Sequence, residues 1–181
     1  MKATVLLFVL GSVACEHSAA APAAVVQTVG AVSAPFAQYR TFAFGLAERP
    51  PAPYAISERG FEVERRAQPL IVAELTNKGY SVSDDGKGDF LVRFSVGYAK
   101  TAVPQPGSTE ASMGSMEYEN VGELVIDAFD GSSRTQVWHG SAEAQIDPKK
   151  INDRLLQTAV QQLLVRFPAR SEGGATDRQP R

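Results

Sequence analysis

Residues 89–98 read DFLVRFSVGY, and their alternation of side chains determines one strand of a sheet. One face carries the apolar and aromatic residues Phe90, Val92, Phe94, Val96 and Tyr98. The opposite face carries Leu91, Arg93, Ser95 and Gly97. A period of two is expected of a half-buried strand, so we predict that this segment packs one face on a core.

Three further segments predict the partners of this strand. Aromatic and strand-forming residues recur in residues 39–44 (YRTFAF) and predict a first strand. Residues 123–129 (ELVIDAF) and the segment that begins TQVWH at residue 135 predict a hairpin, because turn residues (DGSSR) join them. In the later strand, small residues share a face with Trp138 and would let a helix approach the sheet closely.

Residues 64–78 predict a first helix, in which Ile71 and Leu75 lie one turn apart. Gly79 supplies the left-handed residue that ends such a helix. Pro69 leaves two alternatives open. Either the helix begins just before this proline, where a missing N–H costs nothing, or the proline bends a longer helix.

A second helix is predicted by an apolar stripe at helical spacing, which comprises Ile151, Leu155, Leu156, Ala159, Val160, Leu163, Leu164 and Phe167. Asp147 fits its N-cap and Pro148 its first position, and Pro168 ends it. The element order is then β-α-β-β-β-α. We predict an α/β (α+β) two-layer sandwich, in which a mainly antiparallel four-stranded sheet carries both helices on one face.

The first fifteen residues have the pattern of an export signal. Lys2 precedes a mostly apolar run, and the small residues 11–14 lead to Cys15, the only cysteine. The run is too short for a permanent membrane span, which needs about 20 apolar residues. We therefore predict a cleaved signal peptide and a lipid anchor, such as palmitate, on Cys15. The alternative is an ordinary secretory signal cut near residues 19–23.

The sequence predicts four regions: a lipoprotein signal peptide (1–14), a lipid-anchored flexible tether (15–35), a single α/β domain (36–168) and a disordered tail (169–181). The length of 181 residues suffices for one core. Without the signal peptide the chain has 17 basic and 20 acidic residues. This negative balance makes nucleic acid a poor partner.

Several of these segments match a known family in their order: residues 39–44, 74–80, 89–92, 122–130 and 137–142. Together they resemble the bacterial lipoprotein family catalogued as domain of unknown function 4136 (DUF4136), over residues 36–167. The resemblance implies an envelope protein with an α/β fold, anchored through its signal. It implies no activity, and no catalytic residue is carried over from it.

The predicted strands also suggest a hydrolase. His139 and Ser141 share one strand face, and Asp127 and Asp130 lie in or beside the preceding strand. A serine–histidine–carboxylate group would need these side chains in contact. However, Ser141 is not on a Gly-x-Ser-x-Gly turn, so we favour a solvated polar outer face of the sheet. The two histidines are far apart in sequence, and we expect no metal site and no cofactor.

The long loop over residues 101–120 is the strongest candidate for a binding surface. Met113 and Met116 would offer an adaptable apolar contact, and Tyr118 lies beside them. The alternative is a mobile hairpin tip without a binding role, which we consider more common for such loops.

Two classes of function follow from these observations. The favoured one is a non-enzymatic adaptor or assembly module, anchored by lipid in the bacterial envelope, on the outer membrane and facing the periplasm. Its partner would be an envelope protein, glycan or lipid. The alternative is a carrier of a small lipid or glycan, which needs an unfilled pocket between helices and sheet. A hydrolase using His139 and Ser141 ranks third, and the aromatic residues argue for a filled core.

Overall fold

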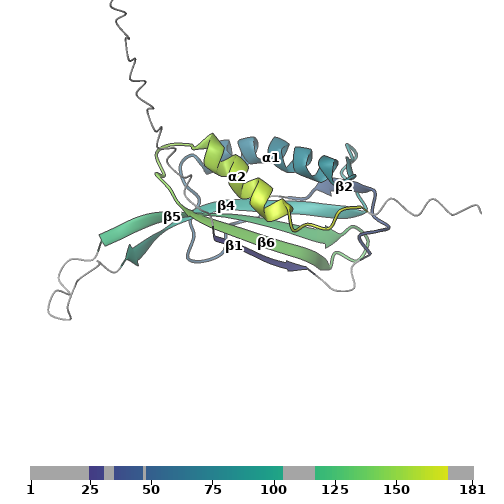
Figure 1. Cartoon of the computed structure of the whole chain (residues 1–181), viewed down its shortest axis with the longest axis horizontal. Helices are drawn as coiled ribbons and strands as arrows, with labels where there is room; N and C mark the ends of the chain where they lie inside the picture. The colour runs from purple at the N-terminus through teal and green to yellow at the C-terminus, as the bar shows by residue number, and fades with distance from the viewer. Residues whose placement is uncertain (1–24, 31–34, 47, 104–116, 171–181) are drawn as a thin grey trace, which may run out of the picture.

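The computed structural model describes residues 25–30, 35–46, 48–103 and 117–170. They form an α+β domain of two layers, with helices α1 and α2 lying across one face of a single sheet (Figure 1). The elements are β1 (Val25–Gly30), β2 (Thr41–Phe44), α1 (Gly60–Asn77), β3 (Ser81–Val82), β4 (Phe90–Val103), β5 (Glu117–Asp130), β6 (Gln136–Gln145) and α2 (Asp153–Leu164).

The sheet has six strands in the order β1-β6-β5-β4-β2-β3. Strands β1, β6, β5 and β4 pair antiparallel, whereas β2 lies parallel to β4 and to β3. The predicted four-stranded sheet is therefore wrong in strand number and in element order. Its four members are all present, and two strands are added to them, one at each edge.

The added strand β1 corrects the predicted tether. Residues 25–30, which we expected to be flexible, pair with β6 from Val25↔Glu143 to Gly30↔Trp138. The other added strand, β3, has only two residues and pairs with Thr41 and Phe42 of β2. The other expected tether residues up to 34, and the tail from residue 171, lie outside the described residues.

Helix α1 confirms the predicted first helix and begins four residues earlier, at Gly60. Pro69 lies inside it, so the longer of the two alternatives holds. The helix ends as expected before Gly79, whose φ of 91° lies in the left-handed region. Ile71 and Leu75 are both fully buried against the sheet.

Helix α2 starts later than predicted. Asn152, not Asp147, is its N-cap, because the Asn152 side chain accepts a hydrogen bond from the Leu155 N–H at 3.1 Å. Asp147 instead accepts the N–H of Lys149 in a separate turn. The chain between β6 and α2 is therefore a loop over residues 146–152, where an additional helical turn was expected.

Aromatic side chains fill one end of the space between helices and sheet. Phe90 lies at the centre of this cluster, within 5.1–5.8 Å of four other rings measured between centroids. Those rings belong to Tyr39, Phe42, Tyr80 and Phe167. The predicted filled core is thus present at this end of the domain.

Strands β4 and β5 continue past the end of β6 as a two-stranded arm, visible at the lower left of Figure 1. Their pairing extends to Val103↔Glu117, whereas β6 pairs with β5 only as far as Val121↔Gln145. The loop expected over residues 101–120 is therefore shorter than predicted. Its first three and last four residues are strand, and residues 104–116 lie outside the described part.

Candidate functional site

A cavity of about 500 Å³ lies between the helices and the sheet, at the end opposite the aromatic cluster. Its floor comes from the helix-facing side of β4, β5 and β6, including Val96, Leu124 and Ala144. Val63 of α1 and Leu155 of α2 form its walls. We call this space the cleft.

The sequence explains why the cleft is open. Ala142 and Ala144 of β6 project only methyl groups, and Gly122 of β5, opposite Ala144, has no side chain. The late start of α2 at Asp153 also leaves a loop, rather than a helical turn, beside these small residues. The small residues of β6 were predicted to admit a helix, but at this end they border empty volume instead.

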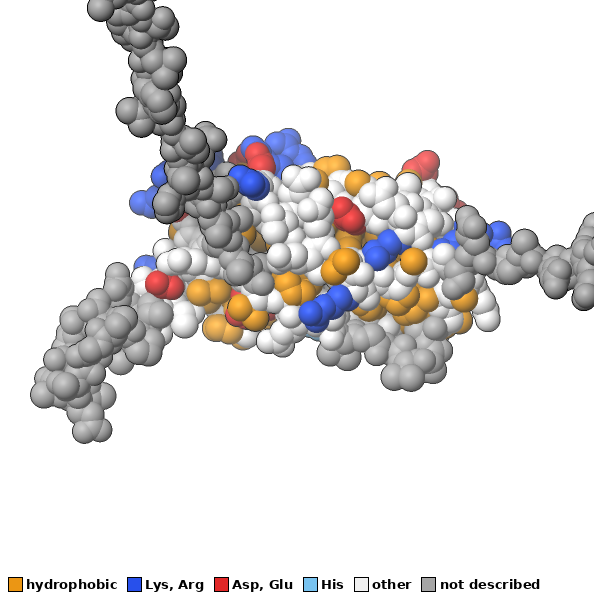
Figure 2. Space-filling model, in the orientation of Figure 1, with side chains coloured by type: hydrophobic (Ala, Val, Ile, Leu, Met, Phe, Trp, Pro, Cys, Tyr) orange, Lys and Arg blue, Asp and Glu red, His pale blue; other side chains and the backbone are white. Residues whose placement is uncertain are grey.

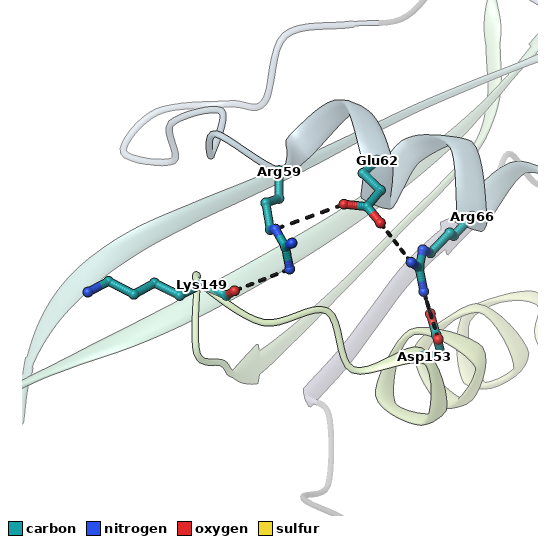
Figure 3. A network of polar contacts seen from close by, with 5 residues as sticks. All are labelled: Arg59, Glu62, Arg66, Lys149 and Asp153. Atoms are coloured by element: carbon teal, nitrogen blue, oxygen red, sulfur yellow. Dashed lines mark hydrogen bonds and ion pairs between the residues drawn. The ribbon is translucent and has the colours of Figure 1, made fainter.

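Charged side chains join the two helices at the rim of the cleft (Figure 3). Arg66 of α1 donates to both carboxylate oxygens of Asp153 at 2.7 and 2.8 Å. Its other terminal nitrogen contacts Glu62 at 2.7 Å, and Glu62 lies 3.9 Å from Arg59. Arg59 also donates to the backbone carbonyl of Lys149 at 3.2 Å. These contacts fix the start of α2 relative to α1.

The surroundings of the cleft are therefore polar at the rim and apolar within. Figure 2 shows Lys and Arg side chains, with some acidic ones among them, at the end of the domain where both helices begin. The hydrogen bonds to Asp153 and Glu62 raise the pKa of Arg66, so its charge persists. Exposed pairs of this kind contribute little stability, and their main effect here is to position the rim.

The opposite face of the sheet is covered by residues 48–55, which we call the strap. Ala55 and Tyr98 exchange two backbone hydrogen bonds of 2.9 Å. Glu48 forms an ion pair with Arg93 at 2.6 Å, and the Tyr54 hydroxyl donates to Glu143 at 2.6 Å. The outer face was predicted to be solvated, and the strap makes this wrong for much of it.

Gly97 of β4 is needed where the strap crosses the sheet. A Cβ at this position would lie 2.7 Å from the Cβ of Pro50 and 2.8 Å from that of Tyr54. Such distances are too short for carbon atoms, so only glycine allows the strap to lie this close. The sequence contains no local pattern that would reveal this contact between distant segments.

Among the four residues of the hydrolase hypothesis, the structure brings two together. His139 Nδ1 lies 2.7 Å from Asp127 Oδ1, and the amide of Gln136 donates to the same oxygen at 2.5 Å. Ser141 follows on the same strand face, and the described residues show no hydrogen bond between Ser141 and His139. Asp130 is used elsewhere: it accepts the Tyr39 hydroxyl at 2.6 Å and the N–H groups of the β5–β6 turn.

Glu123 is a buried carboxylate that sequence reasoning missed. It lies opposite Glu143 across β5 and β6, is only 8% exposed, and its Oε2 has no hydrogen-bond partner among the described residues. Burial raises the pKa of Glu123, the negative charge of Glu143 adds to this effect, and nearby His139 opposes it. The ionised form is therefore disfavoured in the folded protein.

We expect the substitution Glu123→Gln to raise the melting temperature at neutral pH. Because its pKa is raised in the folded protein, Glu123 contributes to stability at pH values below its unfolded-state pKa of about 4.3. This contribution is lost as the pH rises through the folded-state pKa. The gain from Gln should therefore disappear near pH 4. Thermal denaturation at neutral pH and near pH 4 measures this difference in melting temperature, with Glu58→Gln at an exposed position as the control. A loss of stability at pH 7 would contradict the account.

The other predicted site residues are not brought together. Tyr118 lies on the arm, 61% exposed, opposite Ala102. Cys15, Met113 and Met116 lie outside the described residues. Within the described ranges, no group of three or more His, Cys, Asp or Glu side chains is arranged to hold a metal. No helix in that part of the chain is long and apolar enough to cross a membrane.

Comparison with known proteins identifies a family and related folds. The family model described as "Domain of unknown function (DUF4136)" matches residues 26–169. The search of curated proteins found no match. A PDZ domain protein from Parabacteroides distasonis shares 18% identity at a TM-score of 0.55, covering 79% of this chain and 35% of that one. This chain thus spans about a third of that protein's length.

A second solved structure with a similar fold is PelC from Paraburkholderia phytofirmans, crystallised as a dodecamer. It shares 11% identity at a TM-score of 0.50, and the match covers 82% of this chain and all of PelC. At these identities both likenesses concern the fold alone.

Proposed function

The chain belongs to the DUF4136 family, and we propose that it binds a small apolar ligand in the cleft. The observation that carries this proposal is the unfilled volume of about 500 Å³ between helices and sheet. Small-molecule sites in proteins typically have about 300–1,000 Å³ and mostly apolar walls. The carrier function, which ranked second from the sequence, therefore has a specific structural observation in its favour.

The lining indicates the chemistry of the ligand. Val63, Val96, Leu124 and Leu155 present hydrocarbon side chains to the cleft. The charged groups Arg59 and Lys150, with Asp147 and Asp153, lie at its rim. A ligand with an apolar body and a polar end satisfies both regions, since burying an unpaired polar group is costly. A lipid fits this description better than a glycan.

The proposed setting is the bacterial envelope. The proposal places the domain at the membrane through a lipid on Cys15, on the outer membrane and facing the periplasm. The apolar run before Cys15 and the family resemblance support it. A lipid-binding cleft on an anchored domain would then lie near a source of its ligand, and catalysis is not required for this role.

We expect Ala144→Phe to abolish or strongly weaken ligand binding. The phenyl ring would project from β6 into the cleft beside Gly122 and the Ile146 side chain that lies over it, and would take up part of the open volume. The measurement is a fluorescence titration of the purified protein with N-phenyl-1-naphthylamine, an uncharged apolar probe. We expect the affinity to fall by about tenfold or more, which corresponds to about 1.4 kcal/mol.

Gln162→Phe is the matched control, because Gln162 is an exposed residue of α2 outside the cleft. It adds the same ring and should leave the affinity unchanged. Equal affinities for the wild type and both variants would show that the probe binds elsewhere. Failure of the wild-type protein to bind this and other apolar probes would reject the proposal.

A second candidate function is the adaptor that the sequence favoured. The observation in its favour is the arm, which extends beyond the sheet and exposes Tyr118. Isolated two-stranded ribbons are only marginally stable in water, so an arm of this kind gains from a partner. Recovery of a specific envelope protein with an empty cleft would favour this function over ligand transport.

A further inference from the structure

The rim of the cleft carries charges of both signs, and their existing contacts differ. Among the described residues, the charged side chains at the rim are Arg59 before α1, Asp147 and Lys150 in the loop before α2, and Asp153 at the start of α2. Their charges cancel in number. The contacts that each side chain already makes therefore decide which charge is available to a ligand.

The two rim carboxylates are occupied by short hydrogen bonds. Both oxygens of Asp153 accept from Arg66, which does not line the cleft, at 2.7 and 2.8 Å. Asp147 Oδ1 accepts the Lys149 N–H at 3.0 Å. A further acid beside the cleft, Glu123, projects to the opposite face of the sheet, since Leu124 next to it faces the helices. The acids at the rim thus offer a ligand little that is unpaired.

The two rim cations are held by longer contacts. Arg59 Nε lies 3.9 Å from Glu62 Oε2, and the Arg59 side chain is 49% exposed. Lys150 Nζ lies 3.5 Å from Asp147 Oδ2, and the Lys150 side chain is 82% exposed. Both distances exceed the length of an N–H···O hydrogen bond, about 2.7–3.2 Å, and exposed ion pairs contribute little. An anionic ligand can therefore replace these contacts at small cost.

The two cations are also placed to act together. The Arg59 guanidinium donates to the Lys149 carbonyl at 3.2 Å, so it lies beside the backbone that carries Lys150 (Figure 3). Both helices begin at this rim, and the positive ends of helix dipoles favour anions. A guanidinium can hold two oxygens of one carboxylate or phosphate group. The rim therefore favours an oxyanion over a neutral polar group.

We propose that the ligand of the cleft is an amphiphile with an anionic head group, a carboxylate or a phosphate. Arg59 and Lys150 bind the oxygens of the head group at the rim, and the hydrocarbon chain occupies the cleft. This inference rests on the proposed function and adds to it the charge of the ligand. Fatty acids and phospholipids both have this chemistry.

The experiment compares pairs of ligands that share a chain and differ in charge. The purified protein carries Cys15→Ser, so that its own lipid cannot compete. Each ligand displaces N-phenyl-1-naphthylamine from the cleft, below the concentration at which the ligand forms micelles. Myristate is compared with myristyl alcohol, and myristoyl lysophosphatidic acid with monomyristoylglycerol. We expect the anionic member of at least one pair to bind about tenfold or more tightly than its neutral partner.

The ratio of the two affinities in a pair is the readout for the rim residues. Arg59→Gln and Lys150→Gln should each reduce this ratio, and the double variant should bring it close to one. Arg154→Gln is the matched control, because Arg154 is an exposed cation next to Asp153 that does not line the cleft. It should leave the ratio unchanged. Circular dichroism checks that each variant is folded.

The outcomes separate this inference from the proposed function. A preference within the myristate pair alone identifies a carboxylate head group, and one within the lysophosphatidic acid pair alone identifies a phosphate. A protein that binds the probe but prefers neither anionic ligand overturns this inference and leaves the proposed function standing. A preference that persists in the double variant also overturns it. A protein that binds no apolar probe rejects both.

Discussion

Replacement of Phe90 by alanine is expected to lower the free energy of unfolding by about 3–5 kcal/mol. Phe90 has no exposed surface and lies among four aromatic rings that come from separate parts of the chain. Removing its ring loses the burial of the side chain and leaves a cavity that these rings cannot all close. The effect is large because these rings tie Phe90 to β2, to Tyr39 ahead of β2, and to the segments that follow both helices.

Urea denaturation followed through Trp138, the only tryptophan, measures this loss. The matched control is Phe61→Ala, since Phe61 is 79% exposed at the start of α1. Its substitution should change stability by no more than about 0.5 kcal/mol. Similar losses in both variants would contradict the central position of Phe90 in the core.

Gly131→Ala is expected to destabilise the domain by about 3 kcal/mol. Gly131 begins the turn after β5 and donates its N–H to the carbonyl of Asp89 at 2.8 Å. A Cβ there would overlap the carbonyl oxygen of Gly88 and lie 2.8 Å from that of Asp89. Both are backbone atoms of the two residues just before β4, so the clash is relieved only by moving the backbone that leads into the strand.

Gly86→Ala is the control for Gly131→Ala, since both change a glycine in a turn. Gly86 has a φ of 71°, and a Cβ there would meet no atom within 4 Å. We expect only the cost of the left-handed conformation, about 1–2 kcal/mol. Thermal or urea denaturation compares the two variants, and a smaller loss for Gly131→Ala than for Gly86→Ala would contradict the close approach.

The sequence predicted the elements whose local pattern is strong. The alternation in residues 89–98 predicted β4, and the apolar stripe predicted the buried face of α2, because burial imposes a period of two or of 3.6 on these segments. The two ends of that stripe, Ile151 and Phe167, lie outside the helix, which ends at Leu164 and not at Pro168 as predicted. The strands β1 and β3 escaped prediction. Val25–Gly30 has no alternating polarity, and its pairing depends on the distant β6 edge, which no local pattern records.

The candidate site could be predicted only in part. The sequence suggested a pocket between helices and sheet as an alternative, but the cleft depends on where α2 begins. Asn152 and Asp147 are both good N-caps, and local propensity does not choose between them. The outer face of the sheet is covered by the strap. The strap and the sheet contact each other through residues more than thirty positions apart in the sequence, such as Glu48 and Arg93.

The central claim is that the cleft holds an apolar ligand, and native mass spectrometry of the protein extracted from membranes of the producing cell tests it most directly. We expect the wild-type protein to carry a non-covalent species of lipid mass, additional to any lipid on Cys15. The Ala144→Phe variant should lack this species, and Gln162→Phe should retain it. A wild-type protein without any bound species, or equal occupancy in Ala144→Phe, would contradict the account.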